Sequence, residues 1–250
     1  MANTGNGPGL RPRLILFDLD GTLIDSVPDL AGAIGRALGE LGHAAHSVEA
    51  VRAMVGEGQR VLCSRALLAA GAELGRLDEM LGRFRHHYSE RLHEQTVCYP
   101  GVAETLRQLP AEIVKVVATN KPGAWARRLT AHLGLAEHFG WVLGEDDVGV
   151  RKPDPALLLH LCAQAGVRPA EALMVGDSRI DMEAAHAAGM PMAVCTYGYG
   201  DPETMRRVLG SEGSEGSEGS EGSPPGSIGR PYVLRQFAEL LHVIAPARGG

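Results

Sequence analysis

Two carboxylates stand two residues apart where a short apolar run ends. Residues 14–17 are all apolar, and Asp18, Leu19, Asp20 and Gly21 follow them directly. Aspartate is unfavourable in strands, so its position at the end of one indicates another role. Gly21 permits an unusual backbone angle and leaves an amide able to approach an anion. Taken alone, a pair of aspartates at this spacing is compatible with a turn or with a metal site of the kind that nucleotide-sugar enzymes use.

Other polar residues stand in similar places later in the chain. Thr119 and Asn120 follow one apolar run, Asp177 follows another with Asp181 four residues later, and Lys152 lies between them in a proline-flanked segment. Open parallel sheets carry their chemistry outside the carboxyl ends of their strands. We therefore expect these side chains to meet Asp18 at one edge of a sheet.

The secondary-structure elements that must position these polar side chains alternate between strand and helix. Five short apolar runs are typical of buried strands, at residues 14–17, 113–118, 141–143, 172–175 and 192–195. Stretches with helical character lie between them, at 102–109, 122–133, 155–165 and 180–188. This alternation predicts an α/β fold, a doubly wound Rossmann-like parallel sheet with helices on both faces.

The alternation is interrupted after the first strand. Residues 27–97 contain no convincing strand, and apolar residues recur there at helical spacing in four segments, 28–41, 48–55, 59–70 and 77–93. We predict an inserted α-helical cap domain over 27–97, with a core made of 13–26 and 98–250. The sequence Tyr99-Pro100-Gly101 at the return is a candidate hinge. Asp25 is expected to bridge core and hinge, or to cap the first cap helix.

Two segments have compositions unsuited to a packed core. Residues 1–12 are rich in glycine and asparagine and predict a flexible tail. A Ser-Glu-Gly repeat begins at Ser211, and we expect residues 211–227 to form a disordered loop within the core domain, because such a tripeptide cannot bury apolar surface.

Composition limits the partners. Lys and Arg number 24 against 30 Asp and Glu, a net charge of −6, which argues against a nucleic-acid binder. No apolar run is long enough to span a membrane. The four cysteines lie far apart, which favours free thiols in the cytoplasm over zinc or disulfides. We expect a monomer or homodimer that acts on a small anionic molecule.

Four of these segments together match one family. Residues 18–26 read DLDGTLIDS and resemble the first motif of the haloacid dehalogenase (HAD) superfamily of phosphotransferases. Thr119-Asn120, Lys152-Pro153 and the segment from Gly176 to Asp181 resemble its second, third and fourth motifs, in the family's order. The resemblance covers nearly the whole chain and implies a HAD-like core.

The resemblance also implies roles. Asp18 would be the nucleophile that forms an aspartyl-phosphate, and Lys152 would supply a fixed positive charge beside it. Asp20 would protonate the leaving group and then activate water, with a pKa raised by neighbouring carboxylates. Mg2+ would be held by Asp18, the backbone carbonyl of Asp20 and Asp177, with Asp181 orienting the metal shell. Thr119 and the amides near Gly21 and Asn120 would hold the phosphoryl oxygens.

The inserted segment resembles the cap of phosphoglycolate phosphatase-like members of the family. Gly56, Glu57, Gly58 and Arg60 match the cap substrate loop, although that loop usually carries Asn where this chain has Glu57. A carboxylate there faces an anionic substrate unfavourably unless it binds a hydroxyl or pairs with Arg60. The expected reaction is hydrolysis of 2-phosphoglycolate to glycolate and phosphate.

Other activities stay open at this point. The same core residues serve sugar-phosphate phosphatases, such as one acting on N-acetylmuramic acid 6-phosphate, and phosphoglucomutase-like phosphotransferases. Dehalogenating members typically lack the second aspartate, and phosphonate-cleaving members need a cap lysine, whereas no lysine precedes Lys115. A non-enzyme alternative is a receiver-like phospho-acceptor module, but such modules have no large helical insert after the first strand.

Overall fold

A six-stranded sheet forms the centre of the larger of two lobes in the computed structural model, which describes residues 10–200 and 231–244. The strand order is β5-β4-β1-β6-β7-β8, and every neighbouring pair is parallel. The strands are β1 Leu14–Phe17, β4 Val114–Ala118, β5 Trp141–Leu143, β6 Ala172–Gly176, β7 Met192–Cys195 and β8 Tyr232–Leu234. All five expected strands are confirmed to within one residue at each end.

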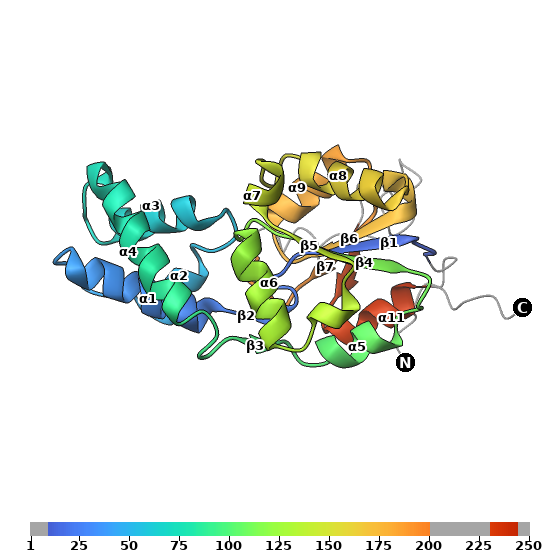
Figure 1. Ribbon diagram of the computed structural model, residues 1–250, viewed down its shortest axis with the longest axis horizontal. Helices are drawn as coiled ribbons and strands as arrows, with labels where there is room; N and C mark the ends of the chain where they lie inside the picture. The colour runs from blue at the N-terminus through green and yellow to red at the C-terminus, as the bar shows by residue number, and fades with distance from the viewer. Residues whose placement is uncertain (1–9, 201–230, 245–250) are drawn as a thin grey trace, which may run out of the picture.

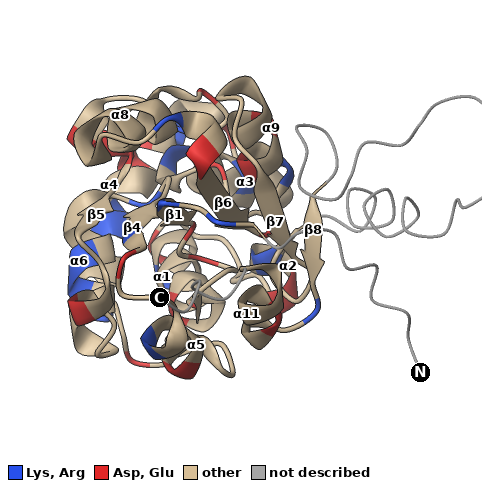
Figure 2. Cartoon of the chain, turned by 90° about the vertical axis from the view of Figure 1, so that its right-hand side faces the viewer, with Lys and Arg blue, Asp and Glu red and all other residues tan. Residues whose placement is uncertain are grey.

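Helices cover both faces of this sheet (Figure 2). On β1, Ile15 and Phe17 join one apolar cluster while Leu14 and Leu16 join the other, so the strand is buried on both sides, as in parallel sheets generally. Helices α8 and α9 contribute to the second cluster, and α5, α6 and α11 to the first. The core helices are α5 Val102–Gln108, α6 Gly123–His132, α7 Glu145–Val148, α8 Ala156–Ala165, α9 Arg179–Ala187 and α11 Leu240–Val243.

The smaller lobe is helical and follows β1 in the chain (Figure 1). It consists of α1 Val27–Glu40, α2 Val48–Arg52, α3 Gln59–Ala69 and α4 Leu77–Glu90. Helix α1 begins with a proline in its first turn, where the missing N–H costs nothing, and buries an apolar stripe against α4. The expected cap helices are confirmed: three of them start at the expected residue, the fourth starts one residue earlier, and all four end one to three residues earlier than expected.

The connections between the lobes contain two strands that the sequence did not predict. Strand β2, Ile24–Asp25, pairs antiparallel with β3, Val97–Cys98, and the pairing continues where the Tyr99 amide donates to the Leu23 carbonyl at 3.0 Å. The expectation of no strand at the end of the insert is therefore wrong at Val97. Strands of two residues are too short to give an alternation signal.

The ends of the chain bear on the two segments expected to be loose. Leu10 forms an isolated bridge with Ile244, and its amide donates to the Val243 carbonyl at 2.9 Å, so the tail expected over 1–12 does not include Leu10. Residues 1–9 and the repeat at 211–227 lie outside the described residues. Within the described ranges, no helix combines the length and apolarity needed to cross a bilayer.

Candidate active site

The carboxyl ends of three neighbouring strands bring the expected polar residues together. Asp18 follows β1, Thr119 follows β4 and Asp177 follows β6. Lys152, from the loop before α8, is almost fully buried beneath them. Its ammonium donates to Asp18 Oδ1 at 2.8 Å and to Asp181 Oδ1 at 2.6 Å. The structure thus unites the four expected motifs at one edge of the sheet, as predicted.

Lys152 is held at both ends. Its ammonium also donates to the Ala118 carbonyl at 2.8 Å, so all three N–H groups have acceptors. Its backbone N–H donates to Asn120 Oδ1 at 2.8 Å, and Asn120 Nδ2 donates back to the Lys152 carbonyl at 2.9 Å. Burial alone lowers the pKa of Lys152, but the Asp18 and Asp181 carboxylates outweigh it and raise that pKa, so the ammonium stays charged.

Three carboxylates crowd into a volume suited to a cation. One oxygen each from Asp18, Asp177 and Asp181 lies within 4.8 Å of the others, and all three residues are buried. Burial, opposed by Lys152 and reinforced by Asp181, raises the pKa of Asp18 to about 6. Burial, followed by repulsion from Asp181 and Asp18, raises the pKa of Asp177 well above its ordinary value. Asp18 and Asp177 therefore resist ionisation while their neighbours carry charge.

This crowding fits a hard divalent cation. Carboxylates and carbonyl oxygens are the ligands that Mg2+ prefers. Four carboxylates converge against two buried ammonium groups, which leaves an excess of negative charge for a cation to neutralise: Asp18, Asp20, Asp177 and Asp181 against Lys121 and Lys152. The Asp177 side chain is itself oriented, since Oδ1 accepts from the Thr22 hydroxyl at 3.0 Å and Oδ2 from the Tyr199 amide at 2.6 Å.

Gly21 is required by close packing rather than as a donor. Its φ is +89°, and a Cβ built there would lie 2.3 Å from Asp177 Oδ2. Any side chain would therefore displace the Asp177 carboxylate. Its N–H donates to the Ile24 carbonyl at 2.9 Å, whereas the amides of Leu19 and Asp20 have no acceptor in the described part of the chain. These two amides, next to Asp18, are the ones available for a phosphoryl oxygen.

In the second motif, Thr119-Asn120, the side chain and the backbone of Asn120 have different roles. The Asn120 side chain is fully engaged, because besides Lys152 it donates to the Gly56 carbonyl of the cap at 3.2 Å. Only its backbone amide is left without a partner in the described structure, and its binding of a phosphoryl oxygen stays a prediction. The Thr119 hydroxyl accepts from the Lys121 amide at 3.2 Å and faces the same cavity as Asp18.

Asp20 has a partner that sequence reasoning missed. The ammonium of Lys121 donates to both of its carboxylate oxygens, at 2.9 and 2.7 Å, and the Ser26 hydroxyl donates to Oδ1. Burial lowers the pKa of Lys121, but the Asp20 charge more than offsets this and raises it. The sequence did offer a clue to this residue, because Lys121 directly follows Asn120 of the second motif and is one of only three lysines in the chain.

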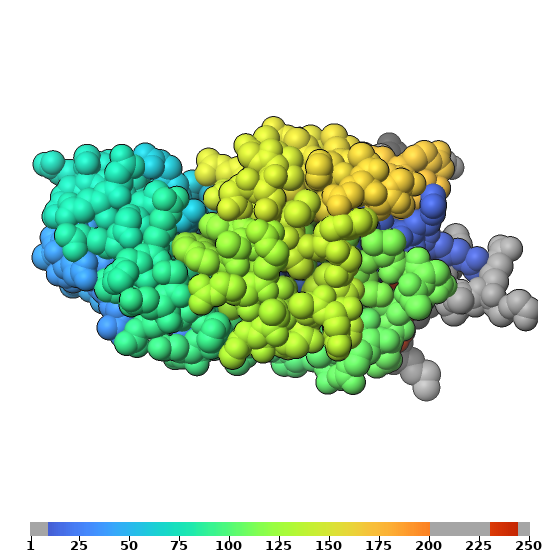
Figure 3. Space-filling view, in the orientation of Figure 1, coloured from blue at the N-terminus to red at the C-terminus, as the bar shows by residue number. Residues whose placement is uncertain are grey.

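A cavity that is partly open to solvent lies between core and cap and has Asp18 and Asp20 in its wall. The cap contributes Gly56, Gly58 and Gln59 from its loop and start of α3. An aromatic surface joins the two lobes, since Tyr88 of cap helix α4 packs edge-on against Trp125 of core helix α6 with ring centroids 4.9 Å apart. Figure 3 shows that the cap and the core are in contact.

Two expected loop residues lie elsewhere. Arg60 donates to Asp78 at 2.7 Å on the outside of the cap, with more than half of its side chain exposed, and does not line the cavity. Glu57 pairs with Arg65, so of the two compensating contacts considered for its charge, the pairing with Arg60 does not occur. Residues 60 and 65 project from different sides of α3, and the docking of that helix decides which of them meets Glu57. Gln59 is the loop residue that sequence reasoning missed.

Comparison with known proteins agrees with this geometry. The family model described as haloacid dehalogenase-like hydrolase matches residues 15–195. A phosphoglycolate phosphatase of Pseudomonas putida is 48% identical over 198 residues, 77% of this chain and 72% of that protein. Phosphoglycolate phosphatase 1 of Pseudomonas aeruginosa is 42% identical over 193 residues, 75% and 71% of the two chains.

A solved structure extends the match to three dimensions. The crystal structure of a predicted phosphoglycolate phosphatase from Haemophilus somnus superposes with a TM-score of 0.81 at 31% identity, covering 93% of this chain and 98% of that one. The sequence motifs, the strand-end geometry and both kinds of comparison therefore agree: the chain belongs to the haloacid dehalogenase-like hydrolases.

Proposed function

We propose that this enzyme hydrolyses 2-phosphoglycolate to glycolate and phosphate, with Mg2+, through an aspartyl-phosphate on Asp18. The broader class, a phosphoric monoester hydrolase, follows from the family and from the relatives together. The observation that carries the proposal is the placement of Asp18 and Asp20 in the wall of one cavity, with Lys152 fixed behind Asp18. The receiver-like alternative is not supported, because the chain is a family hydrolase with a cap over its site.

The reaction is limited by charge. A phosphate monoester repels a carboxylate nucleophile, so the protein must neutralise and position both. Asp18 would attack phosphorus in line with the ester oxygen, forming a bond from its carboxylate oxygen to phosphorus as the bond to the alcohol breaks. Lys152 holds Asp18 in place, while the amides of Leu19, Asp20 and Asn120 and the Thr119 hydroxyl would bind the equatorial oxygens.

Asp20 would handle the protons. It would donate one to the departing alkoxide and later take one from the water that hydrolyses the aspartyl-phosphate. Asp18, Asp177 and the Asp20 carbonyl would hold Mg2+, which supplies positive charge between the carboxylates and the phosphoryl group. Asp181, bonded to Lys152 and to Ser178, would keep that arrangement oriented.

The substrate assignment draws on two observations. The relatives with 42–48% identity that carry the phosphoglycolate phosphatase name span most of this chain. Many of the side chains that line the cavity are apolar, which suits a compact alcohol better than a hydroxyl-rich sugar.

A panel of phosphate monoesters tests the proposal. Phosphate release would be measured from 2-phosphoglycolate, glucose 6-phosphate, N-acetylmuramic acid 6-phosphate and a nucleotide, with Mg2+ and with a chelator. We expect Mg2+-dependent release with the highest kcat/KM on 2-phosphoglycolate. The Asp18→Asn variant should lose at least about 1,000-fold in kcat, the scale seen when a nucleophile is removed. A preference for a sugar phosphate would overturn the substrate, and activity surviving in Asp18→Asn would overturn the mechanism.

A further inference from the structure

One cation lines the cavity without a place in the mechanism above. Lys121 is the only Lys, Arg or His in its wall, as far as the described residues show. Its side chain is only 4% exposed, and its ammonium bonds to both oxygens of Asp20. An ammonium has three donors, and two of them are directed at this one carboxylate.

A second donor lies beside it on the cap. The Tyr88 hydroxyl is fully buried in the cavity wall and forms no well-aligned hydrogen bond within the described structure, although the Lys121 ammonium is close enough to interact with it. The Lys121 ammonium lies 5.1 Å from the centre of the Tyr88 ring, so the two groups are neighbours across the cleft. A buried hydroxyl without a partner is costly and therefore rare, and a ligand commonly supplies the missing bond.

Much of the cavity wall is apolar. Aliphatic and aromatic side chains from both lobes contribute to it: Leu30, Val55, Leu62, Phe84, Pro122 and Trp125. Water is largely excluded from such a wall, and a charge–charge contact there is stronger than in solvent. A group bound in this cavity therefore meets one cation and the Tyr88 hydroxyl against a largely apolar surface.

We propose that Lys121 and the Tyr88 hydroxyl bind an anionic group on the alcohol part of the substrate, and that Lys121 thereby determines specificity for monoesters of hydroxy acids. The inference rests on the proposed function and assigns a residue to its substrate choice. In 2-phosphoglycolate the carboxylate carbon is two bonds from the ester oxygen that Asp20 would protonate. A group so close to that oxygen lies within reach of an ammonium already bonded to Asp20.

The test compares two substrates that differ at one group. In 2-hydroxyethyl phosphate a neutral CH2OH replaces the carboxylate of 2-phosphoglycolate. The ratio of kcat/KM for 2-phosphoglycolate to that for 2-hydroxyethyl phosphate would be measured for wild type, Lys121→Met and Tyr88→Phe. Lys115→Met is the matched control, because Lys115 lies on β4 with its ammonium bonded to the Ile113 carbonyl, away from the site.

We expect wild type to prefer 2-phosphoglycolate. Lys121→Met should lower the ratio by about tenfold to a hundredfold, the scale of one charge-assisted hydrogen bond, and Tyr88→Phe by a few-fold. Lys115→Met should leave the ratio unchanged. Any effect of Lys121→Met on Asp20 itself acts on both substrates and cancels in the ratio.

Three results would overturn the inference. If Lys121→Met slows both substrates equally, Lys121 only positions Asp20. If Lys121→Met does not fold, wild type and Tyr88→Phe decide, and equal kcat/KM values on the two substrates in wild type refute the inference. If wild type hydrolyses p-nitrophenyl phosphate but not 2-phosphoglycolate, the proposed function itself fails and the inference fails with it, a pattern distinct from the other two.

Discussion

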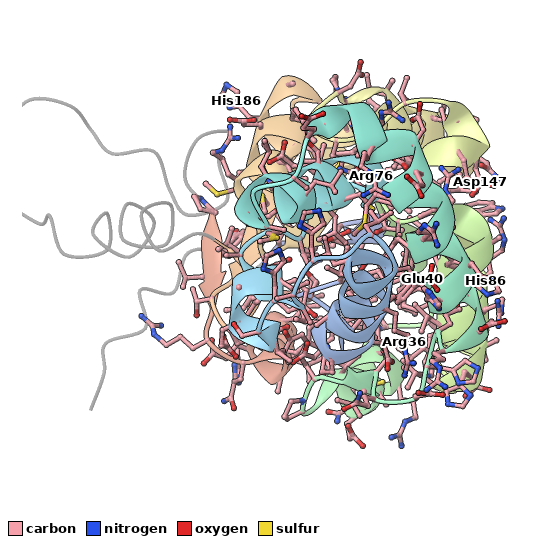
Figure 4. All side chains as sticks on the ribbon, turned by 90° about the vertical axis from the view of Figure 1, so that its left-hand side faces the viewer. Arg36, Glu40, Arg76, His86, Asp147 and His186 are labelled. Carbon is pink, nitrogen blue, oxygen red and sulfur yellow. The ribbon has the colours of Figure 1, made fainter. Side chains whose placement is uncertain are left out.

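The two sides of the cleft are built on opposite principles. On the core side nearly every buried polar group is paired, and Lys152 alone has three acceptors from three segments of the chain. The cap side is mostly apolar, and its Tyr88 hydroxyl, like that of Tyr99 at the hinge, forms no well-aligned hydrogen bond in the described structure. The cap pairs of Glu40 with His87 and of Arg76 with Glu79 involve residues outside the cavity wall, and Figure 4 labels Glu40 and Arg76. The hydrogen bonds of Lys152 hold the reacting groups in fixed positions, whereas the largely apolar cap surface is free to recognise the alcohol part of the substrate.

The two buried lysines sharpen this comparison most strongly. Lys152→Met would leave the Asp18 and Asp181 carboxylates without their shared cation, which costs about 3–5 kcal/mol when a buried pair is broken. We expect the Tm to fall by roughly 10 °C and activity to be lost. Lys121→Met should cost less than half as much, because Asp20 keeps the Ser26 hydroxyl and is partly exposed. Urea denaturation of both variants checks this, and equal losses would contradict it.

The carboxylate cluster predicts how stability depends on pH and metal. The pKa of Asp18 is raised from 3.8 to about 6, and that of Asp177 is also raised, so the folded chain binds protons more tightly than the unfolded chain. Stability of the metal-free enzyme should therefore fall as pH rises from about 4 through 6 and beyond. With a chelator, we expect a higher Tm at pH 5 than at pH 7, and Mg2+ should restore stability at pH 7.

Asp177→Asn is the matched variant for that measurement. It removes one carboxylate, so both the pH slope attributable to the cluster and the stabilisation by Mg2+ should shrink. Thermal scans of wild type and Asp177→Asn at pH 5 and pH 7, with and without Mg2+, give the comparison. Identical slopes in the two proteins would show that the cluster does not set this dependence.

The hinge joins the two sides and should show a smaller effect. Asp25 accepts from the Tyr199 hydroxyl of the core at 2.8 Å and from Arg52 of the cap at 3.1 Å, and its Oδ1 also accepts from the Val27 amide that starts α1. Asp25→Asn should lower kcat/KM by about three- to tenfold by loosening cap placement, with little change in Tm. Tyr199→Phe should behave similarly, and unchanged kinetics in both would exclude the contact from cap positioning.

The smallest effect is expected at the cap loop, where the adjacent residues Gln59 and Arg60 lie inside and outside the cavity wall, respectively. Gln59 lines the cavity and accepts from Arg85 at 2.8 Å, whereas Arg60 faces Asp78 outside it. Gln59→Ala should raise KM for the substrate by a few-fold. Arg60→Met should change kcat/KM by less than about twofold, since exposed ion pairs contribute little. A large loss in Arg60→Met would mean that the loop rearranges around the substrate.

The sequence predicted the site residues of the core better than those of the cap. Asp18, Thr119 and Asp177 were placed together because strand ends in a parallel sheet share one edge, a rule that needs no side-chain detail. Lys121 was missed because its partner Asp20 lies 101 positions away and only packing brings them together. The choice between Arg60 and Arg65 as the partner of Glu57 depends on how α3 rotates against its neighbours, which local spacing does not encode.

The short ladder between β2 and β3 has a consequence for the architecture as a whole. The chain leaves the core at Ile24–Asp25 and returns at Val97–Cys98, and these two points are hydrogen-bonded neighbours. The sheet can therefore close without the intervening helices, since the ends to be joined already lie side by side. A segment of different length or shape could occupy this position with little disturbance to Asp18 or Lys152. The core thus holds the reacting residues independently of the inserted segment, so the cap can vary while the active site stays the same.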